Sequence, residues 1–237
     1  MKSGIISDVH SNLEALTAVL SRLDESGIDR IVCLGDIVGY GADPVECLEL
    51  IAEKCEIVLA GNHDYAVGGK HSVSGFSPDA AEAVTWTQDA ISGSWEVYLS
   101  SLPLIYEEEG IVYVHASPHK PEQWSYIVSR QDAISEFRYF KKSAAFVGHS
   151  HIVGIYCHDG DTFDAEVSLD ENKRYIINVG SVGQPRDGNP AASYAVYDYD
   201  TKRISIERVE YDYKSAAKKI SDVGLPNYLG SRLALGI

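Results

Sequence analysis

The chain has 237 residues, 45% of them hydrophobic and 23% charged, a composition typical of a globular protein with a sizeable buried core. Acidic residues number 35 against 20 basic ones, so the formal net charge is −15. This balance argues against a surface for duplex nucleic acid, which needs clustered Lys and Arg. A local cation site is compatible with it, because bound metal ions reverse the sign of a pocket in an acidic protein.

The cysteines and the first residues bear on the compartment. None of the four cysteines, Cys33, Cys47, Cys55 and Cys157, forms a C-x-x-C pair, and we expect reduced structural thiols. The sequence starts on an apolar strand without the features of a signal peptide, and it has no apolar run of about twenty residues. We therefore expect a soluble, cytoplasmic protein without a membrane partner.

The first sixty residues alternate between predicted strands and helices. Three short segments read as strands that are apolar throughout: 3–7, 30–34 and 56–60. One helix begins at Ser11 and stops at Gly27, and a second is signalled by Asp43-Pro44 and runs to about Glu53. Apolar strands joined by helices predict a parallel sheet covered on both faces.

The rest of the chain adds helices and a different strand texture. We expect a helical insertion at about 66–102, a hairpin around Glu109-Gly110, a helical stretch near 130–140 and a strand at 144–148. Beyond residue 150, short strands with Gly and Asp turns predict a largely antiparallel half, and a last helix is expected over 213–223.

The predicted fold class is α/β, with two mixed β-sheets stacked as a sandwich and flanked by α-helices. We expect residues 1–237 to form a single domain in which each half of the chain provides one sheet.

Five polar clusters share one feature, since each sits at the carboxyl end of a predicted strand. They are Asp8-Val9-His10, Gly35-Asp36, Gly61-Asn62-His63-Asp64, His115 within V-H-A-S, and Gly148-His149-Ser150-His151. Ligands of open α/β sheets bind in the crevice outside the carboxyl ends of the strands. The clusters are therefore predicted to converge on one site.

The residue types of these clusters indicate metal binding. Together they offer carboxylates, imidazoles and an amide oxygen, but no thiolate. This set exceeds the needs of one tetrahedral zinc ion, and two adjacent divalent cations would use all of it, with Asp36 as the obvious bridging carboxylate. Alone, D-V-H is also explained as a helix cap with a solvated histidine and G-N-H-D as a capped turn, so the interpretation depends on the joint occurrence of the clusters.

In this order, the motifs D-V-H, G-D, G-N-H-D, V-H-A-S and G-H-S-H resemble the signature of the calcineurin-like metallophosphoesterase superfamily. Segments 77–87 and 178–188 look like the small bacterial and archaeal phosphoesterases of that superfamily. The resemblance covers most of the chain. It implies a fold of two stacked sheets flanked by helices, with two metal ions at one rim.

The resemblance also implies a role for each site residue. The first metal ion would be held by Asp8, His10, Asp36 and His151, and the second by Asp36 as the bridge, Asn62, His115 and His149. His63 would face the leaving group, and Asp64 would orient its ring. Many relatives have H-G-S-P where this chain has H-A-S-P from His115 onward, which leaves the geometry of that loop open.

The implied activity is that of a metal-dependent phosphoric ester hydrolase acting on a small phosphomonoester or phosphodiester. A hydroxide bridging the two metal ions would attack phosphorus, and His63 would donate a proton or a hydrogen bond to the departing oxygen. Substrate contacts are expected from Asn62, His63 and Arg186, although Arg186 reads equally well as a solvated loop residue. The alternatives are a dinucleoside polyphosphate hydrolase, a protein phosphatase, and a non-catalytic scaffold or phosphate-binding module.

The expected cofactors are two divalent metal ions, and manganese or iron is favoured over zinc, nickel and cobalt. The expected partner is a small phosphorylated substrate rather than long nucleic acid, and the oligomeric state is left open. Trp124 and Tyr126 either line the pocket or pack in the core. Asn12 either caps a helix or contributes to an anion site. His71 matches no pattern and is expected to be exposed.

Overall fold

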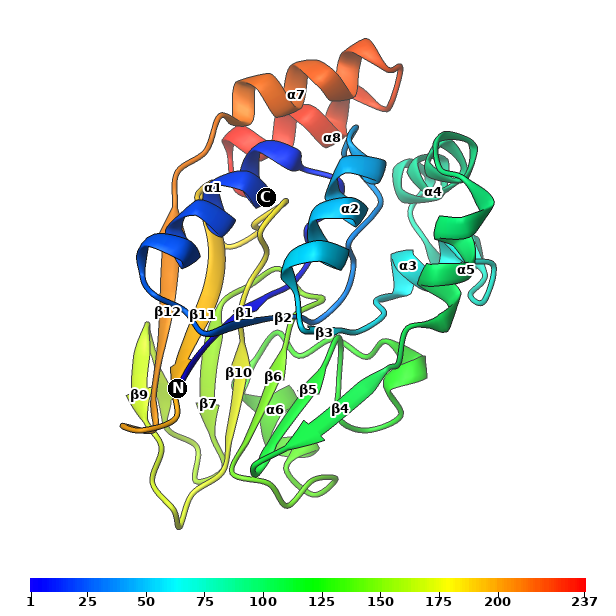
Figure 1. Ribbon diagram of the computed structural model, residues 1–237. Helices are drawn as coiled ribbons and strands as arrows, with labels where there is room; N and C mark the ends of the chain where they lie inside the picture. Colours follow the sequence, from blue (N-terminus) through cyan, green and yellow to red (C-terminus); the bar gives the residue numbers. More distant parts are fainter.

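The computed structural model describes residues 1–237 and shows two six-stranded mixed β-sheets stacked on each other and flanked by helices (Figure 1). In order across the first sheet, the strands are β3 (Ile57–Val58), β2 (Arg30–Cys33), β1 (Lys2–Ile6), β11 (Ala192–Asp198), β12 (Arg203–Val209) and β9 (Glu166–Ser168). Across the second they are β4 (Ile105–Glu108), β5 (Ile111–Val114), β6 (Ala144–Val147), β10 (Tyr175–Asn178), β7 (Gly154–Cys157) and β8 (Thr162–Phe163). The predicted architecture of two stacked mixed sheets is confirmed.

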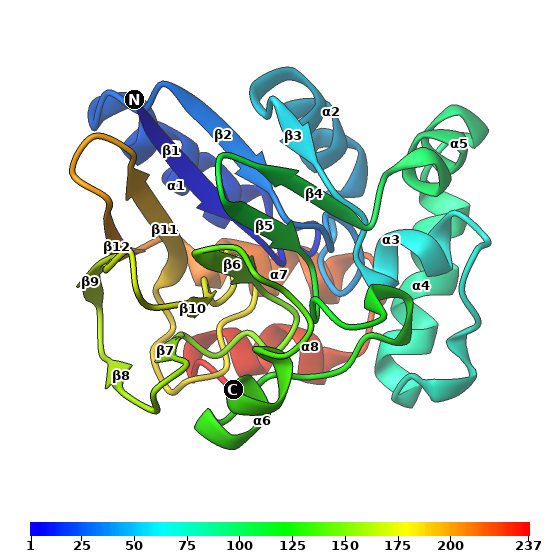
Figure 2. The ribbon, with the colours of Figure 1, turned by 90° about the horizontal axis from the view of Figure 1, so that it is seen from below.

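Helices cover the outer faces of the stack and one of its ends (Figures 1 and 2). The α-helices are α1 (Leu13–Glu25), α2 (Pro44–Lys54), α3 (Asn62–Val67), α4 (Pro78–Ala90), α5 (Gly93–Ser101), α6 (Arg130–Glu136), α7 (Tyr213–Asp222) and α8 (Asn227–Ser231). Three short 3₁₀ helices are η1 (Val73–Gly75), η2 (Pro121–Gln123) and η3 (Arg232–Ala234). None of the helices combines the length and the apolar character needed to cross a bilayer.

Two local predictions are resolved by hydrogen bonds and backbone angles. The Asn12 side chain accepts a hydrogen bond from the backbone N–H of Ala15 (3.1 Å), so this asparagine caps α1. The β4–β5 hairpin turns at Glu109 and Gly110, which both have positive φ angles (43° and 82°). Such angles are those of the tight hairpin turns that match the twist of the strands.

The two sheets do not correspond to the two halves of the chain, contrary to our expectation. In the first sheet, β1 pairs in parallel with β2 on one side and antiparallel with the late strand β11 on the other. In the second, β6 lies between β5 and β10 and is parallel to both. An apolar central strand pairs with another strand on each side. The sequence pattern predicts that such a strand is central, but it does not tell which strands pair with it.

Alternate residues of the central strands face different hydrophobic cores. Ile5 and Val32 point into the layer between the two sheets, where Phe146 meets them from the second sheet. Their chain neighbours Ile6 and Cys33 point the other way, into the core beneath α1 and α2. On the far side of the second sheet lies a separate core, to which α6 contributes Ala133. Figure 2 shows α6 beside this sheet.

Beyond α7, the chain continues into α8 and η3, which the sequence analysis did not predict. Leu225, Leu229 and Leu233 recur at every fourth position and pack together with Ile220 of α7 and Ala83 of α4. In Figure 1 the two helices α7 and α8 lie side by side at one end of the molecule. The last residues of the chain are therefore packed against two other helices.

Candidate metal centre and substrate pocket

The segments that follow five strands meet at one rim of the stacked sheets. All seven predicted metal ligands are buried there: Asp8 and His10 after β1, Asp36 after β2, Asn62 after β3, His115 after β5, and His149 and His151 after β6. Asn62 is the most accessible of them, with 8% of its surface exposed. The first four residues come from the first sheet and the other three from the second.

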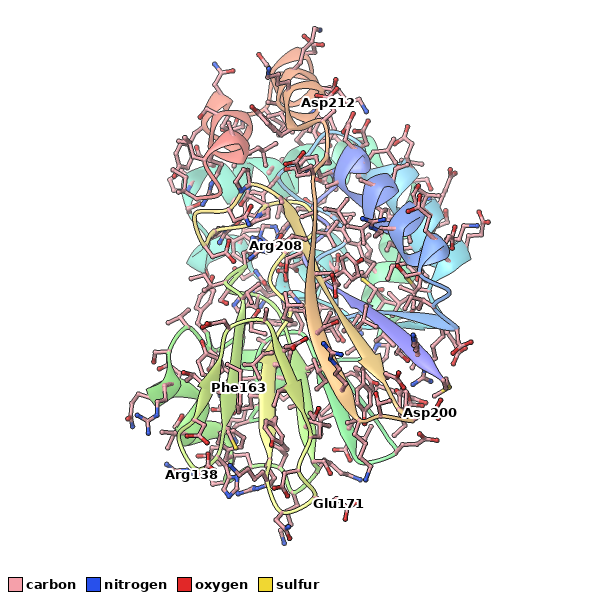
Figure 3. The ribbon with its side chains drawn as sticks, turned by 90° about the vertical axis from the view of Figure 1, so that its left-hand side faces the viewer. Arg138, Phe163, Glu171, Asp200, Arg208 and Asp212 are labelled. Carbon is pink, nitrogen blue, oxygen red and sulfur yellow. The ribbon has the colours of Figure 1, made fainter.

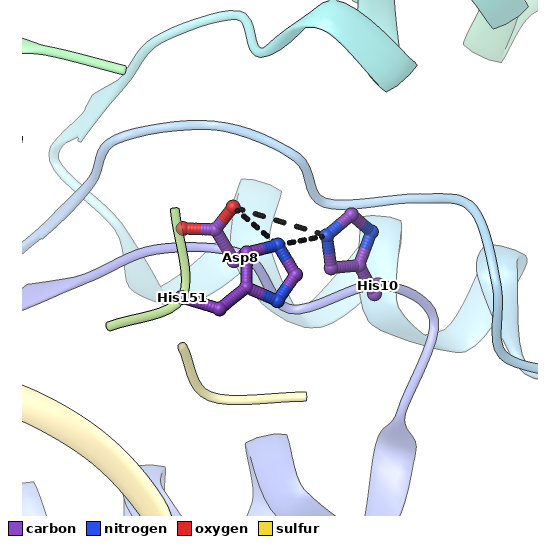
Figure 4. Close-up of side chains that lie close together, drawn as sticks. All are labelled: Asp8, His10 and His151. Carbon is purple, nitrogen blue, oxygen red and sulfur yellow. Dashed lines mark hydrogen bonds and ion pairs between the residues drawn. The ribbon is translucent and has the colours of Figure 1, made fainter. Parts of the chain in front are cut away.

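Asp8, His10 and His151 form one group, whose ligand atoms all lie within 4.8 Å of one another (Figure 4). His151 Nε2 is 3.2 Å from Asp8 Oδ1 and 3.1 Å from His10 Nε2. Ligand atoms bound at about 2.1 Å to one cation lie about 3 Å apart, so these separations suit a shared metal ion.

Asp36, His115 and His149 form a second group of the same kind. Asp36 Oδ2 lies 3.3 Å from His115 Nε2 and 3.7 Å from His10 Nε2, so it is placed between the two groups. This is the position that a bridging carboxylate requires. His63 lies beside them, because its ligand atom is within 4.8 Å of those of His10 and Asp36.

Several buried atoms of the cluster lack the partners that burial requires. Asp8 Oδ1, Asn62 Oδ1 and both ring nitrogens of His115 make no hydrogen bond. A buried polar atom left without a partner costs about 1–3 kcal/mol, and bound cations would satisfy these atoms. Carboxylate, imidazole and amide donors are also a set that divalent transition metals accept. The residues present therefore fit a metal centre.

Three of the imidazole rings are oriented by backbone carbonyl groups. Their hydrogen bonds run from His10 Nδ1 to Val38 O (3.1 Å), from His151 Nδ1 to Gln184 O (2.6 Å) and from His149 Nε2 to Trp124 O (2.9 Å). Because a carbonyl oxygen only accepts, each of these nitrogens carries the proton and the other ring nitrogen keeps its lone pair. The lone pairs on Nε2 of His10 and His151 then face each other, an arrangement that a cation stabilises.

Each carboxylate is held by one oxygen and presents the other to the cluster. Asp8 Oδ2 accepts a hydrogen bond from the backbone N–H of His149 (3.0 Å), and Asp36 Oδ1 accepts one from the backbone N–H of His63 (2.9 Å). Asp8 Oδ1 and Asp36 Oδ2 remain directed at the imidazoles. The backbone thus fixes both carboxylates before any ligand arrives.

Two glycines allow the backbone to come this close to the carboxylates. A Cβ atom at Gly61 would lie 2.0 Å from Asp36 Oδ1, and one at Gly148 would lie 2.5 Å from Asp8 Oδ2. Neither separation is possible between non-bonded atoms. The glycines of the G-N-H-D and G-H-S-H motifs are therefore required by close packing at the cluster.

Five of the seven expected ligands have left-handed backbone angles. Asp8, His10, Asp36, His149 and His151 have φ values between 49° and 64°. For residues other than glycine this conformation costs roughly 1–2 kcal/mol each. Such strained angles gather at functional sites, where the surrounding structure enforces them to aim side chains.

Charge and burial shift the pKa values within the cluster. Against the effect of burial, Asp36 and Asp8 raise the pKa of His115 to about 9. Burial lowers the pKa of His149 to about 3 and that of His63 to about 4. At pH 7, without bound metal, His115 is therefore charged while the other two rings are neutral.

Asp64 does not orient the ring of His63, contrary to our expectation. Its carboxylate accepts hydrogen bonds from the backbone N–H groups of Gly61 (2.9 Å), Ile37 (2.9 Å) and Val38 (3.3 Å). His63 Nδ1 is buried without a hydrogen-bond partner. The Asp64 carboxylate accepts hydrogen bonds from the N–H groups at the start of α3 and after β2, which have no other partner, and not from the His63 ring. Asp64 thus ties together the two segments that carry Asp36 and Asn62.

A pocket of about 400 Å³ opens beside the cluster. Its wall outside the expected ligands includes Tyr40, His63, His71, Phe76, Trp124, Tyr126, Arg186 and Arg232. Tyr126 stacks on the ring of His149 at 4.1 Å, and 56% of its surface is exposed. Both residues line the pocket, but Trp124 is also buried and packs against the rings of Tyr65 and His115.

Arg186, for which a substrate contact and a solvated loop position were the two interpretations, lines this pocket. Nε and Nη2 of its guanidinium donate to Gln184 Oε1 (3.2 and 2.7 Å), and the group lies 5.5 Å from the centre of the Tyr40 ring. His71, expected to be exposed, is partly buried in the pocket wall against the ring of Trp124.

Arg232 was not considered in the sequence analysis, yet it lines the same pocket from η3. It belongs to no motif. The only sequence pattern in its segment is a leucine at every fourth position from Leu225 to Leu233. This pattern predicts that the helix continues, but it does not indicate a functional residue.

Comparisons with known proteins agree with this geometry. The calcineurin-like phosphoesterase superfamily domain matches residues 1–202. An uncharacterized protein from Methanocaldococcus jannaschii is 47% identical over 239 residues, covering 98% of this chain and 97% of its own. A crystal structure of a metallophosphoesterase from Sphaerobacter thermophilus has a TM-score of 0.89 and 40% identity, covering 100% of this chain and 99% of its own. A hypothetical protein from Pyrococcus horikoshii OT3 shares the fold, with a TM-score of 0.82 and 21% identity over 100% of this chain and 98% of its own. The chain therefore belongs to the calcineurin-like phosphoesterase superfamily.

Proposed function

We propose that this protein is a metal-dependent phosphoesterase that hydrolyses a small phosphomonoester or phosphodiester at a dinuclear centre. The observation that carries the proposal is the cluster of buried carboxylates and imidazoles whose unpartnered atoms face one another beside a pocket. Membership of the superfamily supports it, as does the 40% identity to a protein described as a metallophosphoesterase.

The residues that would hold the first ion are Asp8, His10, Asp36 and His151, and those for the second are Asp36, Asn62, His115 and His149. When bound, two divalent ions supply Lewis-acid charge for a phosphate and lower the pKa of water to near neutral. Nitrogen and oxygen donors without a thiolate accept manganese, iron, zinc, nickel and cobalt, and of these we favour manganese or iron.

His63 is the residue that would interact with the leaving group. Its Nδ1 is buried against Gly39, since a Cβ atom added to Gly39 would lie 2.5 Å from this nitrogen. Nε2 is therefore the nitrogen that can reach a ligand in the pocket. From there the ring, which is neutral at pH 7, donates a hydrogen bond from Nε2–H to the departing oxygen. Such assistance contributes typically about 10²–10⁴-fold to a rate.

The shape of the pocket favours a small substrate over a phosphoprotein. Its wall is built from α4, from the segment around Trp124 and from the C-terminal η3, so the cluster is bordered from several sides. The volume of about 400 Å³ lies in the range of small-molecule sites. A dinucleoside polyphosphate is the alternative substrate of the same class, with only part of the molecule inside the pocket.

Elemental analysis of the purified protein, followed by activity assays with added Mn²⁺, tests the proposal. The substrate panel contains p-nitrophenyl phosphate, bis(p-nitrophenyl) phosphate, cyclic nucleotides and dinucleoside polyphosphates. We expect about two metal ions per chain and hydrolysis of at least one class. Asp36→Asn should lose both metal and activity, whereas Asp89→Asn, which changes an exposed carboxylate on α4, should lose neither. A fully metal-loaded protein that hydrolyses none of these esters would instead indicate a phosphate-binding scaffold.

A further inference from the structure

Two arginines that pair with no Asp or Glu side chain line the candidate substrate pocket. The side-chain hydrogen bonds of Arg186 go to Gln184, and the Nε–H of Arg232 donates to a main-chain oxygen of Ile237, the last residue of the chain. Elsewhere in this acidic chain, arginines such as Arg203 pair with a carboxylate. Nη1 of Arg186 and both Nη groups of Arg232 are left without an acceptor, so three donor groups are free at this wall.

The loop that carries Arg186 is fixed in two ways. Asp187 forms an ion pair with Arg208, which Figure 3 shows on β12 at the end away from Asp200. The backbone N–H of the next residue, Gly188, donates to the carbonyl oxygen of Gly236 (2.9 Å). This second bond joins the Arg186 loop directly to the C-terminal segment that carries Arg232.

The position of Arg232 is set by its neighbours in the chain. Leu229 and Leu233 are buried with Ala83 of α4, and Arg232 begins η3 between these two leucines, four residues before the Gly236 contact. Burial, followed by the charge of Arg186, lowers the pKa of Arg232, as expected for two like charges held near each other. Arg232 also lies outside residues 1–202, the part of the chain that matches the superfamily domain.

We propose that Arg186 and Arg232 form a second anion subsite, and that the pocket selects substrates with another phosphoryl group next to the scissile one. This inference rests on the proposed function, which places the scissile phosphate at the metal cluster. A terminal phosphoryl group offers three acceptor oxygens for the three free donor groups, and planar guanidinium groups match that geometry. The substrate class is therefore a diphosphate or polyphosphate ester.

Calorimetric binding of inorganic pyrophosphate and inorganic phosphate to the full-length, metal-loaded protein tests this subsite. We expect wild type to bind pyrophosphate at least about tenfold more tightly than phosphate, given the strength of charge-assisted hydrogen bonds. Arg232→Gln should weaken pyrophosphate binding by about 10–100-fold and leave phosphate binding unchanged. Arg22→Gln removes one charge from the exposed face of α1 and should change neither affinity.

Arg232→Lys serves where the glutamine variant folds poorly. It keeps the charge but removes the guanidinium fork, so pyrophosphate affinity should fall between those of wild type and Arg232→Gln. Equal affinities of wild type for the two anions, or an undiminished preference in a folded Arg232 variant, would overturn the subsite. Failure of the proposed function would give a different result. In that case the wild-type protein hydrolyses none of the esters but can still bind pyrophosphate more tightly than phosphate.

Discussion

Replacing Gly61 by alanine tests whether the backbone at the start of α3 must touch the Asp36 carboxylate. The backbone angles of Gly61 (φ −96°, ψ 178°) are ordinary for alanine, so the substitution introduces no conformational strain. Its only effect is crowding, since the new Cβ atom would lie 2.0 Å from Asp36 Oδ1 and 2.5 Å from the Asp36 nitrogen. Non-bonded heavy atoms need about 3.5 Å, so one of the two segments must move.

The size of the effect follows from what can move. Asp36 Oδ1 is held by the N–H of His63, and Asp64 ties the loop after β2 to the N–H of Gly61, so neither segment can shift alone. Overpacking of this kind costs about 1–3 kcal/mol, or roughly 2–4 °C in melting temperature per kcal/mol for a chain of this size. Displacement of a metal-binding carboxylate should also weaken metal binding by about 10–100-fold.

Competition against a chromophoric chelator measures the affinity for Mn²⁺, and differential scanning calorimetry of the metal-free protein measures the stability. Gly93→Ala is the matched control, because nothing lies within 4 Å of a Cβ atom at this position in α5. Should Gly61→Ala behave like Gly93→Ala in both measurements, the close approach of Gly61 to Asp36 is not required, and the explanation given for the G-N-H-D glycine fails.

Three other predictions concern the leaving group, acid sensitivity and the core. His63→Ala should lower turnover of a poor-leaving-group ester by about 10²–10⁴-fold with metal content unchanged, and an unaltered turnover would refute its role. Against the effect of burial, Asp36 and Asp8 raise the pKa of His115 to about 9, so binding of metal must displace its proton. Metal affinity should thus fall about tenfold for each pH unit between pH 9 and pH 7, and a metal affinity that does not change with pH in this range would contradict this. Phe146→Ala, in the layer between the sheets, should lower the free energy of unfolding by about 3–5 kcal/mol in urea titrations, whereas a cost below about 1 kcal/mol would mean a collapsible site.

The positions of the expected ligands could be predicted because each follows an apolar strand. A strand that is apolar on both faces is a strong signal, and residues such as Asp8 and His149 come directly after one. The chemistry of the side chains then narrows the kind of site. Neither step depends on knowing which strands are neighbours, so the wrong assignment of one sheet to each half of the chain did not affect it.

What could not be predicted depends on contacts across the fold. The partners of Asp64 are backbone N–H groups, and a sequence pattern cannot distinguish these from the adjacent imidazole of His63 as the group that takes the carboxylate. Arg232 enters the pocket because three leucines place its segment against α4 and α7, and no local signal marks that destination. Both residues are set by tertiary packing.

The expected ligands are divided between the two sheets, with Asp8 and Asp36 on one and His115 and His151 on the other. A metal ion bound by residues of both sets would link the two sheets of the sandwich to each other. Removing it leaves two buried carboxylates and unfilled lone pairs at that rim, which destabilises the contact between the sheets there. In the metal-free protein, backbone amide hydrogen exchange should therefore accelerate first at the carboxyl ends of β1 and β6, which lead into the ligand segments. Exchange in the outer helices should accelerate later.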